Sequence, residues 1–423
     1  MNAGLVAAHA TLRWRDGLRY GAPGFPLAFV ALPLYVVLPN HYASEFGVPL
    51  AALGAVLLAA RLLDALIDPW IGRWADALLD TSAHAAWAVM AGAAVVLALG
   101  FRGLFFPPLT EGITGLLAWC AALLAITYLA FSVITVLHQA WGARLGGNER
   151  QRAGVVAWRE GLALCGVLLA SVLPSAAGLH TTTLVFAVAL LLALALLRGA
   201  PAPERLASQA PTSLRLPLGT PAFRRLLGVY LLNGIASAVP ATLVLFFIRD
   251  RLQATAYEPL FLASYFAAAA LSIPLWVSLV GRHGLARTWL AGMVLAIAVF
   301  VWAAWLGTGD VAAFTLVCVL SGIALGADLS LPAALLAGVI QKAGHGGRAE
   351  GAYFGWWNFA TKLNLALAAG LALPALQAFG YAPGSRDAEA LGALTVAYCV
   401  LPCVLKLGAV ALLWRHWIKE PSP

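Results

Sequence analysis

The sequence contains few charged residues. Asp, Glu, Lys and Arg together make up 10% of the 423 residues, whereas 62% are hydrophobic and the mean hydropathy is +0.88. Soluble domains contain about 25% charged and about 45–50% apolar residues, and a soluble chain of this size cannot hide so much apolar surface. The scarcity of charge therefore excludes a soluble multidomain enzyme, a disordered chain and a collagen-like fibre.

Cysteine is also scarce, and the sequence motifs of common catalytic sites are missing. The five cysteines lie in apolar runs, and none forms a metal-type pair with a histidine, so we expect no disulfide framework. The chain has no HExxH, GxSxG, Walker or CxxC motif. We therefore expect neither an enzyme nor a bound cofactor, and ATP-driven transport by this chain alone is not supported.

Long apolar runs are what the sequence has in abundance. About 260 apolar residues, at roughly 20 per span, suffice for about twelve transmembrane helices. Membrane-spanning strands would be alternating segments of only about 10 residues, so we expect an all-α membrane protein with twelve transmembrane helices. The predicted spans are about 20–40, 48–70, 84–101, 112–139, 154–176, 180–198, 226–248, 257–281, 287–307, 311–340, 350–379 and 388–414.

A single long polar segment divides the chain. Residues 199–225 are rich in Pro, Ser and Arg and predict a cytoplasmic linker between two six-helix bundles, 1–198 and 226–423. The halves echo each other, because DPWIGRWAD at 68–76 and IPLWVSLVGRHG at 273–284 both place Pro, an aromatic residue and Gly-Arg in that order. Large secondary transporters use such parallel repeats, with the binding site between the halves.

The net charge of +8 reflects basic loops on one side of the membrane. With the N-terminus in the cytoplasm, 18 of the 26 Lys and Arg residues lie in cytoplasmic segments and four lie in loops on the other side. Cytoplasmic loops of membrane proteins carry such an excess. We therefore expect both termini in the cytoplasm and no nucleic-acid partner.

Charged residues inside the predicted spans are the main functional signal, because each costs at least ~2.5–3.5 kcal/mol at the bilayer centre. In RLLDALIDPWIG, residues 61–72, Arg61, Asp64 and Asp68 share one helix face. Two carboxylates one turn apart repel each other, and a bound cation relieves the repulsion. We interpret Asp64 and Asp68 as a Na⁺ or H⁺ site. The alternative is a salt-bridge network with Arg61 that has only a conformational role.

Two lysines also lie in apolar spans. Lys362 lies deep in its span and needs a carboxylate partner, for which Asp64 or Asp68 is the obvious choice. We therefore add Lys362 to the cation site, with snorkelling to a helix end as the alternative. Lys406 lies closer to the cytoplasmic end, and we expect its amine to snorkel.

Three further charges leave two interpretations each. Arg159 and Glu160 open the fifth span, where Arg159 faces the cavity while Glu160 anchors the loop, or both form a cytoplasmic gate. Asp328 faces the cavity or braces the helix break at Pro332. The predicted gating and ion-pair residues are Arg61, Arg73, Asp76, Glu160 and Asp328.

Polar and aromatic residues interrupt two apolar spans, at 138–141 and at 353–358. Trp and Tyr also populate membrane interfaces, and for each residue alone that ordinary role is the alternative. The predicted solute-binding residues are Arg159, Thr135, His138, Gln139, Tyr353, Trp357 and Asn358.

Three segments, in order along the chain, carry a family resemblance. They are RLLDALIDPWIGRWAD at 61–76, HQAWGARLGGNERQRAGVVAWRE at 138–160 and GADLSLPAALLAGVIQKAGHGGRAEGAYFGWWNFATKLNLALAAG at 326–370. They resemble the second helix, the loop between helices four and five, and the tenth and eleventh helices of the glycoside–pentoside–hexuronide:cation symporter family. That family sits within the major facilitator superfamily. The resemblance covers nearly the whole chain, and it implies the major facilitator fold and alternating access between two bundles.

The resemblance also implies roles for individual residues. Asp64 and Asp68 match the carboxylates that bind the coupling cation, Lys362 matches a lysine near that site, and Arg159 matches an arginine that lines the sugar site. The sequence departs from the family elsewhere. Helix one carries no charge, helix four offers Ser132, Thr135, His138 and Gln139 where sugar-binding carboxylates are expected, and Arg144 stands where members often have an acid. These departures leave an amphipathic solute open.

We therefore expect a secondary active transporter that couples symport of a small solute, such as a sugar or glycoside, to Na⁺ or H⁺. Its expected partners are the solute, the coupling cation and the lipid bilayer, and we expect a monomer in a bacterial-type inner membrane. Two alternatives remain: a lysolipid or amphiphile transporter of the same fold, and a membrane scaffold that does not transport.

Overall fold

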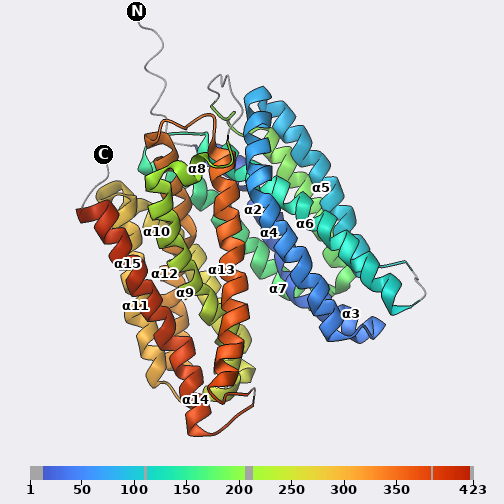
Figure 1. The fold of residues 1–423 in the computed structure, drawn as a ribbon, viewed down its shortest axis with the longest axis vertical. Helices are drawn as coiled ribbons and strands as arrows, with labels where there is room; N and C mark the ends of the chain where they lie inside the picture. The colour runs from blue at the N-terminus through green and yellow to red at the C-terminus, as the bar shows by residue number, and fades with distance from the viewer. Residues whose placement is uncertain (1–12, 109–111, 205–212, 383, 420–423) are drawn as a thin grey trace, which may run out of the picture. The chain divides into compact units, whose positions relative to one another are not determined.

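The computed structural model is built from long helices (Figure 1). It describes residues 13–108, 112–204, 213–382 and 384–419, and these ranges contain no strand. Nine helical stretches within them are long and apolar enough to cross a membrane. The predicted all-α membrane fold is thereby confirmed, whereas the number of twelve spans and the cytoplasmic location of both termini stay predictions.

The chain divides into two compact units. The first unit holds Met1–Pro217 together with Ile340–Phe359, and the second holds Leu218–Val339 together with Ala360–Pro423. The segment Ile340–Phe359 thus belongs with the N-terminal helices although it lies far along the chain. The bounds predicted from sequence, with bundles at 1–198 and 226–423 and a linker at 199–225, stay a prediction.

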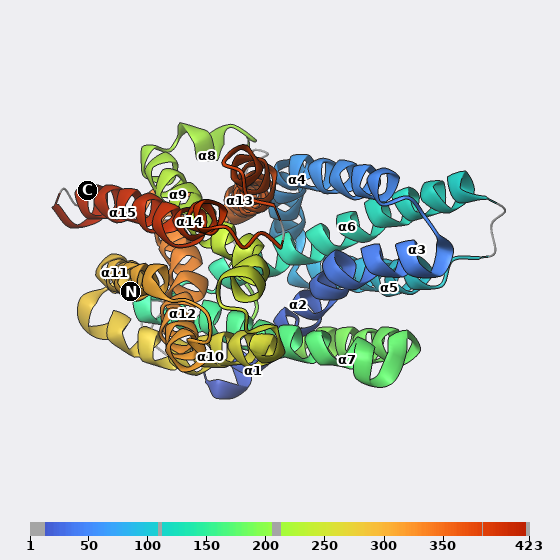
Figure 2. The ribbon, with the colours of Figure 1, turned by 90° about the horizontal axis from the view of Figure 1, so that it is seen from below.

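The first unit is built around the long helices α4, α5, α6 and α7. Helix α4 packs on α6, α5 packs on α6 and α7, and α7 also packs on α1 and α2, as Figure 2 shows for α4, α5 and α6. The elements of this unit are α1 (Trp14–Gly21), α2 (Gly24–Leu32), η1 (Pro33–Val37), α3 (Leu38–Phe46), α4 (Leu50–Thr81), α5 (Ala83–Phe105), α6 (Ile113–Ala143) and α7 (Glu149–Arg198). The short α8 (Leu216–Gly219) follows at the boundary with the second unit.

Helix α7 contains a kink at the place where the sequence predicts a gap between two spans. It spans 50 residues but consists of two helical segments that meet at Gly178, which has a non-helical backbone with φ 79° and ψ 169°. A positive φ is tolerated by glycine because it has no Cβ. The predicted spans 154–176 and 180–198 therefore meet at this glycine rather than across a loop.

In the second unit, α15 packs against α9 and α11, and α10 packs against α11. Helix α12 begins here and ends in the first unit, whereas α13 begins in the first unit and continues here. The elements are α9 (Pro221–Phe246), η2 (Phe247–Arg251), η3 (Thr255–Tyr257), α10 (Glu258–His283), α11 (Leu285–Phe300), η4 (Val301–Trp305), α12 (Val311–Lys342), α13 (Glu350–Ala378), α14 (Ala388–Thr395), η5 (Val396–Val400), α15 (Leu401–Leu413) and η6 (Trp414–Lys419).

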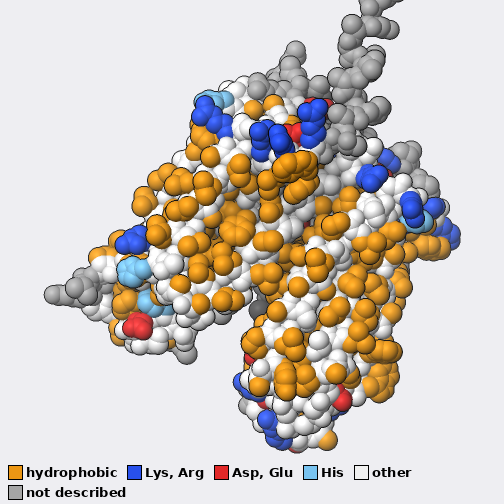
Figure 3. All heavy atoms as spheres, turned by 180° about the vertical axis from the view of Figure 1, so that it is seen from behind, with side chains coloured by type: hydrophobic (Ala, Val, Ile, Leu, Met, Phe, Trp, Pro, Cys, Tyr) orange, Lys and Arg blue, Asp and Glu red, His pale blue; other side chains and the backbone are white. Residues whose placement is uncertain are grey.

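Large apolar side chains cover much of the surface. Leu271 is 80% exposed, Trp305 74% and Leu99 66%, and Figure 3 shows hydrophobic side chains over most of the visible face. Helices satisfy their own backbone hydrogen bonds and can therefore face lipid tails. An apolar surface of this extent belongs to a multi-pass membrane protein.

Candidate functional site

Helix α4 buries two carboxylates one turn apart. Asp64 is 8% exposed and Asp68 is fully buried, and residues at i and i+4 of a helix have Cβ atoms roughly 5–6 Å apart. The hydroxyl of Ser132 on α6 donates a 2.6 Å hydrogen bond to Oδ1 of Asp64. The pair thus sits inside the first unit, with a hydroxyl oxygen beside one of its members.

The backbone around Asp68 adds a further oxygen. Pro69 follows it inside α4 and lacks the N–H that would bond the carbonyl of Ala65 in a regular helix. Gly355 of α13 packs so closely that a Cβ there would lie 2.5 Å from the carbonyl oxygen of Asp68. Carboxylate, hydroxyl and carbonyl oxygens are what a hard cation requires, and this stretch of α4 can supply all three kinds together with α6.

The basic residues predicted for the cation site and for gating have different surroundings. The guanidinium of Arg61 is 4.1 Å from the centre of the Tyr35 ring, and Arg73 is exposed. Lys362 lies in the part of α13 that belongs to the second unit. Its pairing with the α4 carboxylates stays a prediction.

Helix α6 presents polar atoms that lack hydrogen-bond partners in the described part of the chain. They are Oγ1 of Thr135, Nδ1 of His138 and Oε1 of Gln139. Positions i, i+3 and i+4 share one helix face, so the three atoms belong to one side of α6. Buried polar atoms are nearly always hydrogen-bonded, so a row of three without partners points to a ligand.

The orientation of His138 is fixed by Tyr20 of α1. Nε2 of His138 lies 2.7 Å from the carbonyl oxygen of Tyr20, and the Tyr20 hydroxyl donates to the carbonyl of His138 at 3.2 Å. A carbonyl can only accept, so Nε2 carries the proton in this arrangement. A neutral His138 ring therefore offers Nδ1 as an acceptor.

The predicted solute residues of α13 lie in its first turns, within the first unit. Tyr353 is fully buried, and its hydroxyl lies 2.7 Å from Nδ1 of His345; burial and the nearby Arg348 lower the pKa of His345. Trp357 and Asn358 are buried as well. Among the described residues, Nδ2 of Asn358 finds no acceptor, so this amide is available to a ligand.

Arg159 and Glu160 of α7 pair with each other. Oε1 of Glu160 accepts from Nε of Arg159 at 2.9 Å and from its NH2 group at 2.7 Å. Arg159 is 8% exposed, and a Cβ on Gly24 of α2 would collide with its carbonyl oxygen. The backbone of α7 at Arg159 thus packs directly against α2, and the part of the pair in solute binding or gating stays a prediction.

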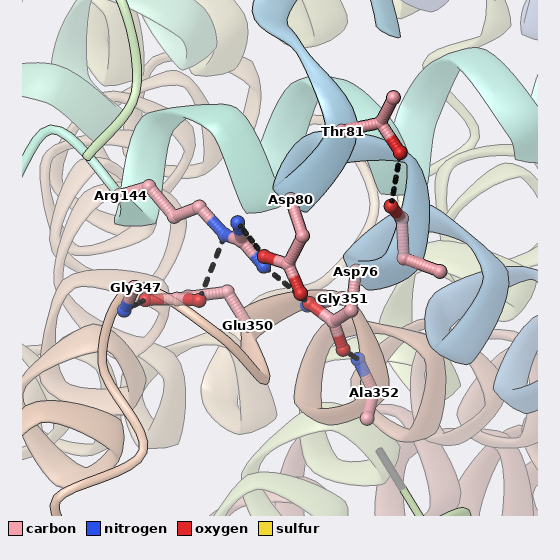
Figure 4. A network of polar contacts seen from close by, with 9 residues as sticks. Asp76, Asp80, Thr81, Arg144, Gly347, Glu350, Gly351 and Ala352 are labelled. Carbon is pink, nitrogen blue, oxygen red and sulfur yellow. Dashed lines mark hydrogen bonds and ion pairs between the residues drawn. The ribbon is translucent and has the colours of Figure 1, made fainter. Parts of the chain in front are cut away.

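A buried arginine holds three acids together at one end of the first unit (Figure 4). Arg144 is 1% exposed and bonds Asp76 at 3.1 Å, Asp80 at 2.8 Å and Glu350 at 3.0 Å. Asp76 also accepts from the backbone N–H groups of Gly351 at 2.7 Å and Ala352 at 2.8 Å. This Arg144 cluster joins the ends of α4 and α6 to the start of α13.

Electrostatics and small residues both favour the Arg144 cluster. Burial opposes the charge of Arg144, but Glu350, Asp76 and Asp80 outweigh it and raise its pKa. A Cβ on Gly72 would collide with the carbonyl of Gly351, so glycine is required at this contact. The sequence prediction included Asp76 only. The sequence does contain a signal for the cluster. Asp76 and Asp80 lie one turn apart just beyond the second predicted span, and Arg144 follows the fourth predicted span.

Lys406 does not snorkel, and that prediction is wrong. It is 7% exposed, and Nζ donates to Asp328 and to Asn233, both at 2.7 Å. Asp328 also accepts from Nε1 of Trp289 at 2.8 Å. Acceptors on α9 and α12 satisfy the amine inside the second unit, so it has no need to reach the membrane surface.

Comparisons with known proteins agree with this architecture. A relative from Escherichia coli (strain K12), the inner membrane symporter YicJ, is 26% identical over 166 residues, which cover 38% of this chain and 35% of that protein. The chain thus aligns with about a third of the length of this relative. A crystal structure of a bacterial homologue of the iron transporter ferroportin has a TM-score of 0.71 at 17% identity, covering 96% of this chain and 99% of its own. The E. coli fucose:proton symporter FucP has a TM-score of 0.65 at 14% identity, covering 95% and 99%.

The family assignment follows from a match over nearly the full chain. The family described as MFS/sugar transport protein matches residues 19–420. The resemblance seen in the sequence is thereby confirmed, as is the prediction that the chain is a transporter and not an enzyme. The chain belongs to the MFS/sugar transport protein family.

Proposed function

We propose that this transporter couples the movement of a small hydroxylated solute to Na⁺ or H⁺ in a bacterial inner membrane. The observation that carries the proposal is the buried pair Asp64 and Asp68 on α4. The relative YicJ, named an inner membrane symporter, supports both the coupling and the location.

The coupling rests on the electrostatics of the carboxylate pair. Two buried carboxylates one turn apart raise the energy of the doubly ionised state, and ionised groups inside a membrane are costly. A Na⁺ ion or a proton on the pair removes that cost. A cation shifts the equilibrium between conformations only by its differential affinity for them, so in our proposal the pair binds it more tightly in one conformation.

The solute class rests on the polar side of α6. Thr135, His138 and Gln139 offer hydroxyl, imidazole and amide atoms without partners among the described residues. The imidazole nitrogen and the amide oxygen accept hydrogen bonds, and the hydroxyl can do so too. A solute with several neighbouring hydroxyl groups matches such a row. This supports a sugar or glycoside over an amphiphile.

The remaining residues receive roles in the same cycle. Lys362 competes with the cation for Asp64 and Asp68, which ties release of the cation to conformation. The Arg144 cluster acts as a latch that holds the start of α13 against α4 and α6, and its separation accompanies opening. Arg159 and Glu160 contribute to the solute site from α7, and Asn358 contributes from α13.

Transport into proteoliposomes tests the proposal. A panel of radiolabelled monosaccharides and methyl glycosides would be offered with a Na⁺ gradient, with a pH gradient and with neither. We expect accumulation of at least one sugar under one gradient, lost in Asp68→Asn and kept in Glu45→Gln, a neutralised acid at an exposed position. Uptake that no gradient drives would overturn the coupling, and uptake of lysolipids alone would overturn the solute class.

A further inference from the structure

The second unit contains a cavity that is separate from the residues assigned above to cation and solute. Its volume is about 190 Å³, and its lining comes from α9, α10, α11, α12, η5 and α15. None of its lining residues comes from α13, the helix that carries Lys362. All of its lining residues belong to the second unit.

Several aromatic rings contribute to the walls of the cavity, among aliphatic and small side chains. Two of them, Phe261 and Phe314, meet edge to face with centres 4.9 Å apart, and Tyr398 meets Phe300 with centres 5.2 Å apart. Aromatic side chains favour another ring in edge-to-face or offset contact. The six lining rings are Phe261, Tyr265, Phe266, Phe300, Phe314 and Tyr398.

The size of the cavity suits a single substituted ring. An apolar cavity of roughly 150 Å³ binds benzene and stays dry when it is empty. A volume of about 190 Å³ therefore leaves room for one ring and a small substituent.

One wall of the cavity is polar and favours a hydrogen-bond donor. Asp328 lines it and accepts one bond on each oxygen, from Trp289 and from Lys406. A carboxylate has about four acceptor positions, so Asp328 keeps acceptor capacity after both bonds. Lys406 already donates to Asp328, Asn233 and Ser237, which leaves it no proton to offer an anion.

We propose that this cavity binds a neutral single-ring aromatic alcohol of the phenol class. The ring packs among the aromatic side chains, and the hydroxyl donates to Asp328. Neither contact requires the Asp328–Lys406 pair to separate. Because no residue of the α4 carboxylate pair or of the polar side of α6 lines the cavity, the proposal does not depend on the proposed transport.

Fluorine NMR of 4-fluorophenol tests the site with the full chain in lipid nanodiscs. We expect saturable broadening of the fluorine signal with the unmodified protein. Ser321→Phe fills the cavity from α12 and should weaken binding about tenfold or more, which corresponds to ~1.4 kcal/mol. Leu316→Phe is the matched control, because Leu316 lies on the same helix, is 48% exposed and does not line the cavity.

A change in the probe tests the hydroxyl without changing the protein. 4-Fluoroanisole has the same ring but no donor, and we expect it to bind about tenfold more weakly, since one hydrogen bond to a charged group is lost. Equal binding of both probes would overturn the contact with Asp328. No saturable signal with the unmodified protein, or equal affinity in Ser321→Phe and Leu316→Phe, would overturn the site. The anisole comparison stands even where Ser321→Phe fails to fold.

Discussion

Two sites of buried charge, one in each unit, are built in opposite ways. In the second unit, Lys406 and Asp328 form one neutral pair at 2.7 Å, and Asn233 and Trp289 satisfy further sites on each. In the first unit, α4 places two acids, Asp64 and Asp68, on the same face one turn apart. A neutral pair is complete in itself, whereas two like charges have an electrostatic reason to take up a cation.

The comparison extends to the Arg144 cluster. There one cation meets three acids, and backbone N–H groups of Gly351 and Ala352 stabilise Asp76 further. Buried charges that are paired and hydrogen-bonded stabilise one arrangement and are costly to separate. The cluster therefore suits a latch, the second-unit pair suits a fixed support, and the α4 pair suits a site that changes its occupancy.

The largest expected effect is on coupling. Asp68→Asn removes one of the two like charges, so the remaining carboxyl has little reason to bind a cation. We expect accumulation to disappear in proteoliposomes, with exchange of solute across the membrane retained. The thermal midpoint of the variant should not fall, because a repulsion has been removed. Retained gradient-driven accumulation would remove the distinction between the α4 pair and the Asp328–Lys406 pair.

A loss of stability is expected next, in the second unit. Lys406→Met leaves Asp328 buried without its cation, and breaking a buried pair in this way costs about 3–5 kcal/mol. Unfolding in detergent with increasing SDS measures it. The double variant with Asp328→Asn removes both charges and should recover much of the loss. A single variant as stable as the unmodified protein would show that the pair is no support.

A smaller loss is expected at the Arg144 cluster. Arg144→Lys keeps the charge but cannot bond three carboxylates in the geometry of a guanidinium, and a lost hydrogen bond to a charged group is worth about 1.5–3 kcal/mol. The same SDS titration measures it, with Arg150→Lys at an exposed position as the control. Equal stability of the two variants would contradict a latch that depends on the guanidinium geometry of Arg144.

The smallest effect is expected at the surface. Asp16 and Arg19 form an ion pair at 3.7 Å, with side chains 28% and 46% exposed. Exposed pairs contribute about 0–1 kcal/mol, so Asp16→Asn should shift the SDS midpoint hardly at all. A loss of stability as large as that of Lys406→Met would contradict the expectation that an exposed ion pair contributes less than a buried one.

Local patterns in the sequence were sufficient for part of the fold. Apolar runs of about 20 residues predict spanning helices because a helix of that length crosses the hydrocarbon core of a bilayer. The gap predicted near Gly178 corresponds to a kink in α7. The spacing of Asp64 and Asp68 places them on one face because helix geometry is local. Such features do not depend on which distant segments meet.

The remaining features depend on distant contacts. Glu350 meets Arg144 across 206 positions, and Asn233 meets Lys406 across 173. No local spacing reports which acids surround a given cation, so the sequence predicts a snorkelling Lys406 and gives no role to Asp80 or Glu350. The missing partners of Thr135 and Gln139 are likewise visible only once the neighbouring helices are in place.

Thermal unfolding of the purified protein against Na⁺, Li⁺ and pH, beside Asp68→Asn, tests most directly whether the α4 pair binds the coupling cation. We predict a saturable rise of the midpoint with Na⁺, or a midpoint that depends on pH in the absence of a metal effect, and in either case the response disappears in Asp68→Asn. A response that Asp68→Asn retains in full, or the absence of any response to Na⁺, Li⁺ and pH, would contradict the account.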